Sequence, residues 1–188
     1  MPNTELKLVY QNDLFGKKNQ YGKYGIRSDI KSYELLIDNQ PVISIVVEYE
    51  RFNENEPNYS AAYVSYNNLY FHKQSEFNNK GYATIALKEI TEILLKEGLV
   101  PVITLQITAD NERSIKVAKK AGYLETKPEE YSVYHKDAIK MFEEGLSYLK
   151  DEDEDLYDMQ LKARLDLLKK YISQKKEKEN EDINKHTK

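Results

Sequence analysis

The sequence predicts an α+β fold, in which a central mixed β-sheet of the α/β type is flanked by helices and followed by a C-terminal helical extension. Three observations lead to this prediction. Strand-like runs dominate up to residue 72, helical and strand-like runs alternate from 82 to 135, and only helical spacing follows His135. We therefore expect a domain over residues 1–135, amphipathic helices over 136–172 and a disordered tail over 173–188, a segment with almost nothing to bury.

The first part of the chain is expected to hold four strands. A loop over 11–32 separates the first two, because this segment carries three of the seven glycines and shows no apolar period. The turn DNQP joins the second and third strands into a hairpin, and the Asn-Asn pair at 67–68 is the expected site of a bulge in the fourth. The four runs are ELKLVY (5–10), SYELLI (32–37), PVISIVVEYE (41–50) and YSAAYVSYNNLYFH (59–72).

The apolar period changes at Tyr82. Apolar residues recur there at helical spacing, which predicts a helix from Tyr82 to Glu97 that ends at Gly98. These apolar residues are Ala83, Leu87, Ile90 and Leu94. The elements expected next are a buried strand in VPVITLQI (100–107), a second helix in DNERSIKVAKKAG (110–122) and two short strands in YLETKPEEYSVYH (123–135).

Two amphipathic helices are expected beyond the domain, over 137–150 and 156–172. The second has only about two heptads of apolar repeat, fewer than an independent coiled coil needs. We therefore expect 137–172 either to fold back on the domain or to form a homodimer with a second copy, burying Leu161, Leu165 and Leu168.

Composition narrows the possible functions. The chain has no cysteine, and His72, His135 and His186 are scattered, so no metal site is expected. The net charge of −4, with basic and acidic residues mixed, makes a nucleic-acid partner unlikely and fits a cationic or amine-bearing partner. No run is long and apolar enough for a membrane span, and the N-terminus lacks the pattern of a signal peptide, so we expect a cytoplasmic protein.

The stretch NNKGYATIAL (78–87) places Gly81 and Ala83 two positions apart, where a loop becomes a helix. A helix start offers N–H groups without partners and a partial positive charge, so it can bind an anion. A large side chain at the closest positions would keep a pyrophosphate away from the backbone. Lys80 adds a cation beside them, and neither a P-loop nor a full Rossmann glycine pattern is present.

The chain resembles the GNAT superfamily of N-acetyltransferases in two blocks. SEFNNKGYA (75–83) is similar to the family's cofactor motif, Arg/Gln-x-x-Gly-x-Gly/Ala, and LQITADNERSIKVAKKAGY (105–123) is similar to its Leu-x-Ile, Asn-x-x-Ser and Lys-x-Gly-Phe/Tyr block. The blocks match in order and spacing, and the resemblance covers about 32–135. It implies a GNAT-like sheet and acetyl-CoA as co-substrate, without a metal.

The resemblance also implies where the cofactor binds. The pyrophosphate is expected on the amides of about 79–84, and the pantetheine arm between two splayed strands, at the end of 59–72 and in 100–107. Asn111 serves equally well as a helix cap, and Ser114 fits a role in the first helical turn. The expected cofactor-binding residues are Phe71, His72, Lys73, Asn78, Asn79, Lys80, Gly81, Tyr82, Ala83, Thr84, Asn111 and Ser114.

Two positions depart from the family pattern. Asn78 stands where the motif most often has Arg or Gln, which removes a longer side chain from the phosphate loop. Ala118 stands seven residues after the motif asparagine, where many members carry a tyrosine proposed to protonate the departing thiolate. The usual general acid is therefore missing, and water, Tyr123, Tyr131 or Tyr134 are the alternatives.

The implied mechanism is direct attack of a neutral amine on the thioester. A backbone N–H between Phe71 and Lys73 is the expected oxyanion donor. The candidate bases are Glu48, Glu50 and His72. Each of them could instead be an exposed charge at the end of a strand. The catalytic candidates are Glu48, Glu50, His72 and Tyr134.

The sequence leaves the acceptor open among a small-molecule amine, a protein N-terminus and a lysine side chain. Although the acceptor is open, the two motif blocks support an acetyl-CoA-dependent amine acyltransferase. The alternative is a noncatalytic protein of the same fold that binds CoA or acts as a scaffold, and that uses its C-terminal helices to bind a partner. Ala118 and Asn78 favour that alternative, whereas the phosphate-loop glycine opposes it.

Overall fold

The structure, a computed structural model, describes residues 2–70 and 75–186. A seven-stranded sheet in the order β1-β2-β3-β4-β5-β7-β6 runs through the molecule. Its strands are β1 (Thr4–Gln11), β2 (Asp29–Ile37), β3 (Gln40–Arg51), β4 (Tyr59–Asn68), β5 (Val102–Gln106), β6 (Leu124–Lys127) and β7 (Glu130–Tyr134). The helices are α1 (Tyr82–Glu97), α2 (Glu112–Lys120), α3 (Ala138–Gly145), the 3-10 turn η1 (Ser147–Leu149) and α4 (Glu154–His186).

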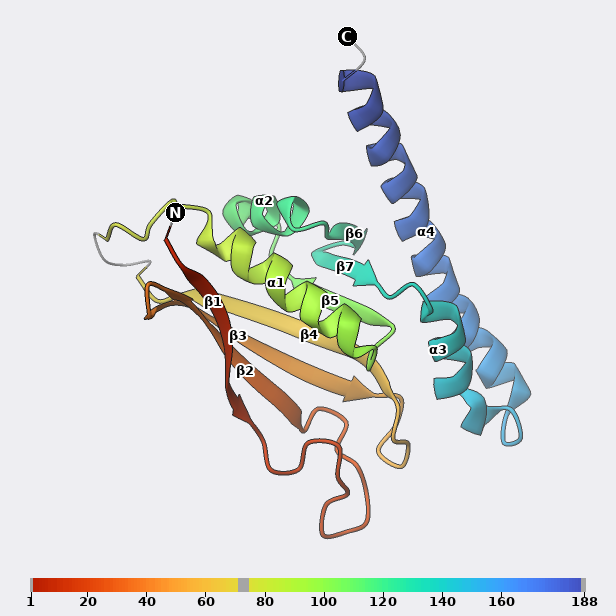
Figure 1. Ribbon diagram of the computed structural model, residues 1–188. Coiled ribbons are helices and arrows are strands. Elements are labelled where there is room, and N and C mark those ends of the chain that lie inside the picture. Colours follow the sequence, from red (N-terminus) through yellow and green to blue (C-terminus); the bar gives the residue numbers. More distant parts are fainter. Residues whose placement is uncertain (1, 71–74, 187–188) are drawn as a thin grey trace.

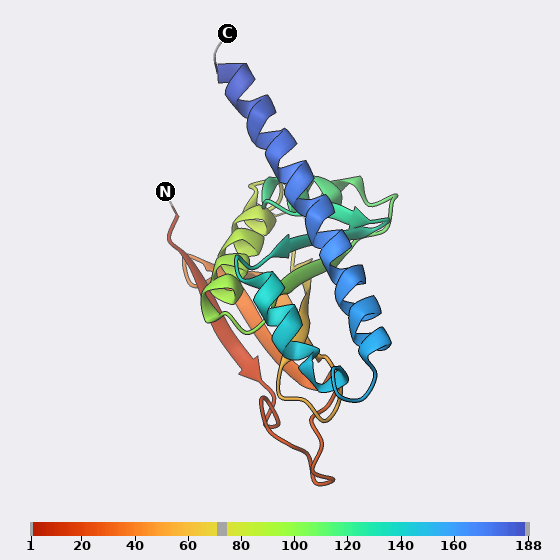
Figure 2. The same cartoon turned by 90° about the vertical axis from the view of Figure 1, so that its right-hand side faces the viewer.

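The two faces of the sheet are covered by different helices (Figures 1 and 2). Helices α1 and α2 share one core with the first face, where Val47 and Tyr49 of β3 and Ile103 of β5 are completely buried. Helices α3 and α4 pack against the other face at the β5–β7–β6 end, where Val102 and Tyr134 join their cluster. Strand alternation therefore sends successive residues of β5 to different layers.

Strands β4 and β5 separate soon after they begin to pair. They are the only parallel neighbours among the described strands, and their register holds two residue pairs, Ala62 with Ile103 and Tyr63 with Thr104. Strand β4 continues to Asn68 without β5 beside it. The sheet is thus open between the C-terminal ends of these two strands.

The C-terminal helices fold back on the domain, which is the first of the two expected alternatives. Phe142 of α3 and Leu168 and Tyr171 of α4 are buried together, with Leu161 and Leu165 packed at the edge of the same cluster. Gly145 of α3 lies directly against the ring of Phe52. These apolar contacts explain why the second helix needs no coiled-coil partner.

The tail differs from the expectation of disorder over 173–188, because helix α4 continues to His186. The segment is rich in Lys, Glu and Gln, which have high helix propensity, so a helix started by buried residues continues through it. The side chains of Gln174 and Lys178 also donate hydrogen bonds to the carbonyl oxygens of Glu125 and Lys119, at 2.9 and 3.4 Å.

The predicted fold class is confirmed, and α1 has the predicted bounds. The bulge at 67–68 is a wrong prediction, because Asn67 and Asn68 pair with Ser44 and Ile43 in unbroken register. The irregularity between β3 and β4 lies instead at Glu50 and Arg51. Among the described residues, none of the helices has the length and apolarity that crossing a membrane requires.

Candidate active site

Helix α1 begins with an uncovered backbone. Gly81 is its N-cap residue, with φ of 80°, and among the described residues no side chain caps the helix. A Cβ added at Gly81 would meet no described atom within 4 Å. The first turn contains no acidic residue. These features leave the N–H groups at the very start of the helix, before that of Thr84, which donates to the Gly81 carbonyl oxygen, available to an anion.

A cavity of about 290 Å³ lies in front of this helix start. Its cations are Lys80 from the loop and Arg113, Lys116 and Lys120 from one face of α2. Arg113 Nη2 donates a hydrogen bond to Asn79 Oδ1 at 2.9 Å, which ties α2 to the loop. Lys116 also pairs with exposed Glu112 at 3.6 Å. None of the described residues that line the cavity is acidic.

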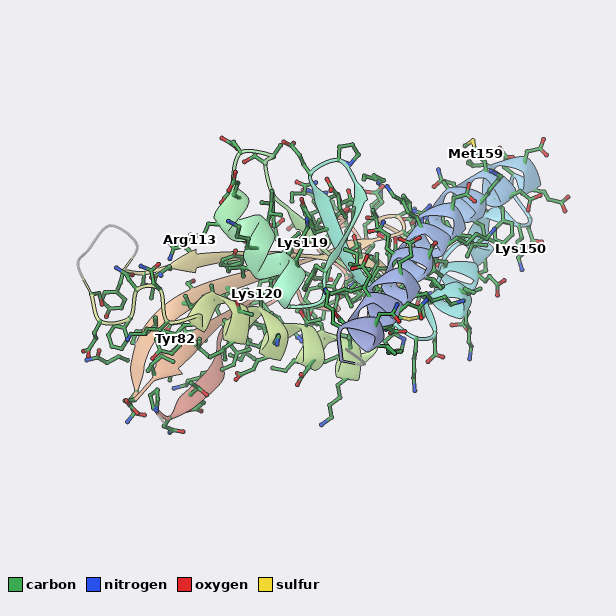
Figure 3. All side chains as sticks on the ribbon, turned by 90° about the horizontal axis from the view of Figure 1, so that it is seen from above. Tyr82, Arg113, Lys119, Lys120, Lys150 and Met159 are labelled. Carbon is green, nitrogen blue, oxygen red and sulfur yellow. The ribbon has the colours of Figure 1, made fainter. Side chains whose placement is uncertain are left out.

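Figure 3 shows Arg113 and Lys120 on α2, beside the part of the chain where Tyr82 begins α1. Four cations therefore surround a helix N-terminus whose dipole has the same sign. Such an arrangement suits a ligand with several negative charges, and the open space at Gly81 lets that ligand reach the backbone.

A second cavity, of about 260 Å³, occupies the gap between the splayed strands. Its walls are Val64–Tyr66 of β4 and 105–108, which includes the end of β5. Asn111 and Ser114 of the α2 start close it, and Asn111 Oδ1 accepts the Ser114 backbone N–H at 3.1 Å as the helix cap. The cavity is a narrow slot with strand backbone along its sides.

A third cavity, of about 400 Å³, lies on the other face of the sheet, under α4. Glu50, Tyr63 and Tyr134 line it, together with Thr104 and Arg164. Glu50 Oε2 lies 3.3 Å from Arg27 Nη2, and the Glu50 side chain is 26% exposed. Burial, with a smaller effect of Glu50, raises the pKa of Tyr63 to about 12.

Helix α4 gives this third cavity a cation. Burial lowers the pKa of Arg164, although Tyr148, Glu50 and Tyr63 oppose that effect. Arg164 Nη1 donates a hydrogen bond to Gln160 Oε1 at 2.6 Å, one helical turn away. The C-terminal extension is therefore part of the wall of the cavity.

The slot and the third cavity are lined by neighbouring residues of β4 and β5. Tyr63 and Thr104, the last pair between β4 and β5, line the third cavity. The next residues along the two strands, Val64 and Leu105, line the slot. A molecule lying in the slot would thus end beside the third cavity.

The predicted cofactor residues fall into four groups. Residues 79–84 line the charged cavity, whereas Asn111 and Ser114 line the slot. Asn78 lies in a turn just before, where its N–H donates to the Ser75 carbonyl oxygen at 3.2 Å. Phe71, His72 and Lys73, and with them the expected oxyanion donor, lie outside the described residues.

The catalytic candidates separate as well. Glu50 and Tyr134 come together in the third cavity. Glu48 is two residues earlier on the same face of β3 but lines neither the slot nor the third cavity. His72 lies outside the described residues. In the described part of the chain, no group of three His, Asp or Glu residues is arranged to hold a metal ion.

The alternative acids have different surroundings. Tyr123 is completely buried, with its hydroxyl 2.7 Å from Thr91 Oγ1. Tyr131 belongs to the core under α1. Tyr134 lies in the third cavity, where burial raises its pKa. Position 118 of α2 offers no acid, because it holds an alanine, which is completely buried.

Sequence reasoning missed several residues of these cavities. The basic residues Arg113, Lys116 and Lys120 recur at steps of three and four, a helical spacing that marks one face of α2. Tyr66 and Arg164 carried no comparable signal, because their roles depend on the splaying of two strands and on where α4 packs.

Comparison with known protein families gives one match. The acetyltransferase (GNAT) domain profile matches residues 19–124. Comparison with curated proteins gave no match.

Three solved structures are similar to this chain at low sequence identity. The aminoglycoside acetyltransferase AAC(6')-Ib in complex with coenzyme A and kanamycin is 16% identical, with a TM-score of 0.45 over 59% of this chain and 69% of that chain. The ribosomal L7/L12 α-N-protein acetyltransferase RimL in complex with coenzyme A is 16% identical, with a TM-score of 0.44 over 56% and 62%. The GNAT domain of S. lividans PAT is 15% identical, with a TM-score of 0.43 over 63% and 64%.

Proposed function

Because the chain belongs to the acetyltransferase (GNAT) domain family, we propose that it transfers an acetyl group from acetyl-CoA to a primary amine. The observation that carries the proposal is the junction formed by the Tyr63–Thr104 pair, whose two residues line the cavity under α4 while the next residue of each strand lines the slot. Two ligands that enter from different sides would touch there. A direct transfer needs such a meeting point.

The charged cavity fits the phosphates of CoA. The backbone of Gly81 to Thr84 would receive the pyrophosphate, and Lys80, Lys116 and Lys120 would surround its charge. The slot would hold the pantetheine arm, with Asn111 and Ser114 at its side. Acetyl-CoA supplies the activated acyl group when bound, so this chain has to orient it and exclude water.

The cavity under α4 is the proposed acceptor pocket. Glu50 is the carboxylate we propose as the base, because it is partly buried there and held by Arg27. It would take the proton that the amine loses as the new bond forms. Tyr63 keeps its proton at neutral pH, because its pKa is raised to about 12 mainly by burial, and can donate a hydrogen bond to the acceptor.

The noncatalytic alternative has one supporting observation, the completely buried Ala118 at the position of the family's tyrosine. Release of free CoA from acetyl-CoA, measured with a panel of polyamines, aminoglycosides and peptides with free amino groups, separates the two functions. We expect at least one amine to stimulate release in step with acetylated product. Binding of acetyl-CoA without release by any amine would favour the scaffold.

A further inference from the structure

Tyr66 of β4 has an unusual environment at the slot. Tyr66 lines the slot together with Ser114, and its hydroxyl oxygen is buried. Among the described residues this hydroxyl makes no well-formed hydrogen bond, although the Ser114 side chain lies close enough to interact with it weakly. Leaving a buried hydroxyl unpaired costs roughly 1–3 kcal/mol, so a ligand that supplied a partner would remove that cost.

We propose that Tyr66 donates a hydrogen bond to the sulfur of CoA as the thioester breaks, from the strand side of the slot. It would then stabilise the departing thiolate, which many relatives are proposed to protonate with a tyrosine on α2, where this chain has Ala118. The inference rests on the proposed function, and it names a residue of the same site.

The geometry supports a hydrogen-bond donor on β4 in place of one on α2. Ser114 and Ala118 are one turn apart on α2, so their side chains lie on the same face. Ser114 and Arg113 are close enough to lower the pKa of Tyr66, and the Ser114 side chain faces the slot that Tyr66 also lines. Tyr66 thus lines the slot beside Ser114, one helical turn along α2 from Ala118.

The protonation state fits a donor. Burial is the largest influence on Tyr66 and raises its pKa, although Ser114 and Arg113 oppose it. The hydroxyl therefore holds its proton at neutral pH. A hydrogen bond from a neutral donor to an anionic acceptor is worth more than one between neutral groups, so the donor acts most when the sulfur becomes charged.

The step balances without a further reactant. The amine nitrogen forms a bond to the acetyl carbon, the carbon–sulfur bond breaks, and the electron pair of that bond goes to sulfur. The amine's surplus proton goes to the base. Tyr66 keeps its own proton at Oη and shares it with the thiolate through the hydrogen bond, and the thiolate later takes a proton from solvent.

The test uses Tyr66→Phe, which removes one oxygen, and Tyr33→Phe as the matched control. Tyr33 is also a buried strand tyrosine on the α1 side of the sheet, but it lines neither the slot nor the acceptor pocket. The first readout is the thiol pKa of bound CoA, followed by thiolate absorbance across a pH series. The second is kcat for the best amine of the panel.

We expect the thiol pKa of bound CoA to rise by about 1–2 units in Tyr66→Phe relative to wild type, as loss of a hydrogen bond to a charged group implies. For the same reason kcat should fall by about 10–100-fold. The control should leave both values unchanged. The ligand-free melting temperature of Tyr66→Phe should stay level or rise, because the substitution removes an unpaired buried hydroxyl.

Each other outcome overturns a defined claim. A Tyr66→Phe protein with the wild-type thiol pKa and kcat overturns the inference and leaves the proposed function intact. A Tyr66→Phe protein that fails to fold or melts much lower would show that the hydroxyl has a structural partner, which also overturns the inference. Wild-type protein that binds no CoA overturns the proposed function and the inference with it.

Discussion

Tyr63 of β4 and Thr104 of β5 form the last residue pair before these two strands diverge. Everything proposed for the site depends on this pair. Beyond it the strand backbones separate and form the slot, while on the α4 side both residues line the acceptor pocket. The divergence of two parallel strands thus gives the chain a place where two molecules can react.

The phosphate loop is tested by Gly81→Glu, which places a side chain and a negative charge where the anion must approach. Acetyl-CoA at about a hundred times its dissociation constant should stabilise the wild type by roughly 2.7 kcal/mol. For a protein of about this size, this corresponds to a rise of about 5–10 °C in melting temperature. Thermal melts with and without acetyl-CoA should show almost no rise for the variant.

The control is Gly22→Glu, because Gly22 also has a positive φ, 74°, and no described atom within 4 Å of an added Cβ. It shares the backbone strain of Gly81→Glu but lies in the loop before β2. Its rise with acetyl-CoA should equal that of the wild type. A Gly81→Glu protein that keeps the full rise would remove the loop from the site.

The basic face of α2 is tested by comparing two neighbouring lysines. Lys120 lines the charged cavity, whereas Lys119 does not. Lys120→Ala should weaken CoA binding about two- to five-fold, the range for one solvent-accessible ion pair, and the difference should shrink as salt is added. Calorimetric titration at low and high salt measures both effects. Equal losses for Lys119→Ala would indicate only a general attraction by net charge.

The proposed base is tested by Glu50→Gln, which keeps the shape and removes the carboxylate. We expect kcat with the best amine to fall by about 10²–10⁴-fold, the range for loss of a general base. The acetyl-CoA melting shift should remain, since Glu50 lies on the other side of the junction. Glu48→Gln, two residues earlier on the same strand face, is the control, and a larger loss there would exchange the two roles.

The attachment of the C-terminal helices is tested at Gly145. A Cβ there would overlap Cε2 of the Phe52 ring, so Gly145→Ala must displace the ring or the helix. Overpacking of this kind costs about 1–3 kcal/mol, and a fall of several degrees in melting temperature should follow. The adjacent exposed residue provides the control, Glu144→Ala, which should change little. Equal melting of both variants would mean that α3 is loosely attached.

Alkaline pH should destabilise the protein through its buried tyrosines. Burial raises the pKa of Tyr33 and Tyr63 from the ordinary 10 to about 12. A group whose pKa is raised by folding contributes its stability in full below about pH 10 and loses it as pH rises through about 12. Each such tyrosine then lowers the free energy of unfolding by up to about 1.4 kcal/mol per pH unit. Melts across this range, with tyrosinate absorbance, should show both changes together. Complete ionisation near pH 10 in the folded protein would contradict the expectation.

Local chemistry explains what the sequence could predict. Helix α1 starts after Gly81 and ends at Gly98, both with positive φ, so its bounds follow from residues that mark helix ends by themselves. The uncovered helix start at Gly81, where we propose that the phosphates bind, was predictable for the same reason. The regular pairing at 67–68, where a bulge was expected, could not be predicted, since cross-strand register depends on residues of β3 far away in the sequence.

The acceptor pocket shows why the rest of the site could not be predicted. Its residues come from β3, β4, β5, β6, β7, α3 and α4, and only the strand order brings Glu50, Thr104 and Tyr134 together. Arg164 joins them because buried leucines hold α4 against the domain. The sequence separations between these residues follow no helical or strand period. The pocket could therefore be identified only from the three-dimensional packing.

The placement of the slot and the acceptor pocket on either side of the Tyr63–Thr104 pair has a kinetic consequence. In the proposed reaction the two ligands would bind in separate cavities, so neither would have to leave before the other arrives, and no residue would have to carry the acetyl group in between. Initial rates measured against both substrates should then give intersecting rather than parallel double-reciprocal lines. The order in which the two substrates bind would then be set by their affinities alone, because neither substrate would block the cavity of the other.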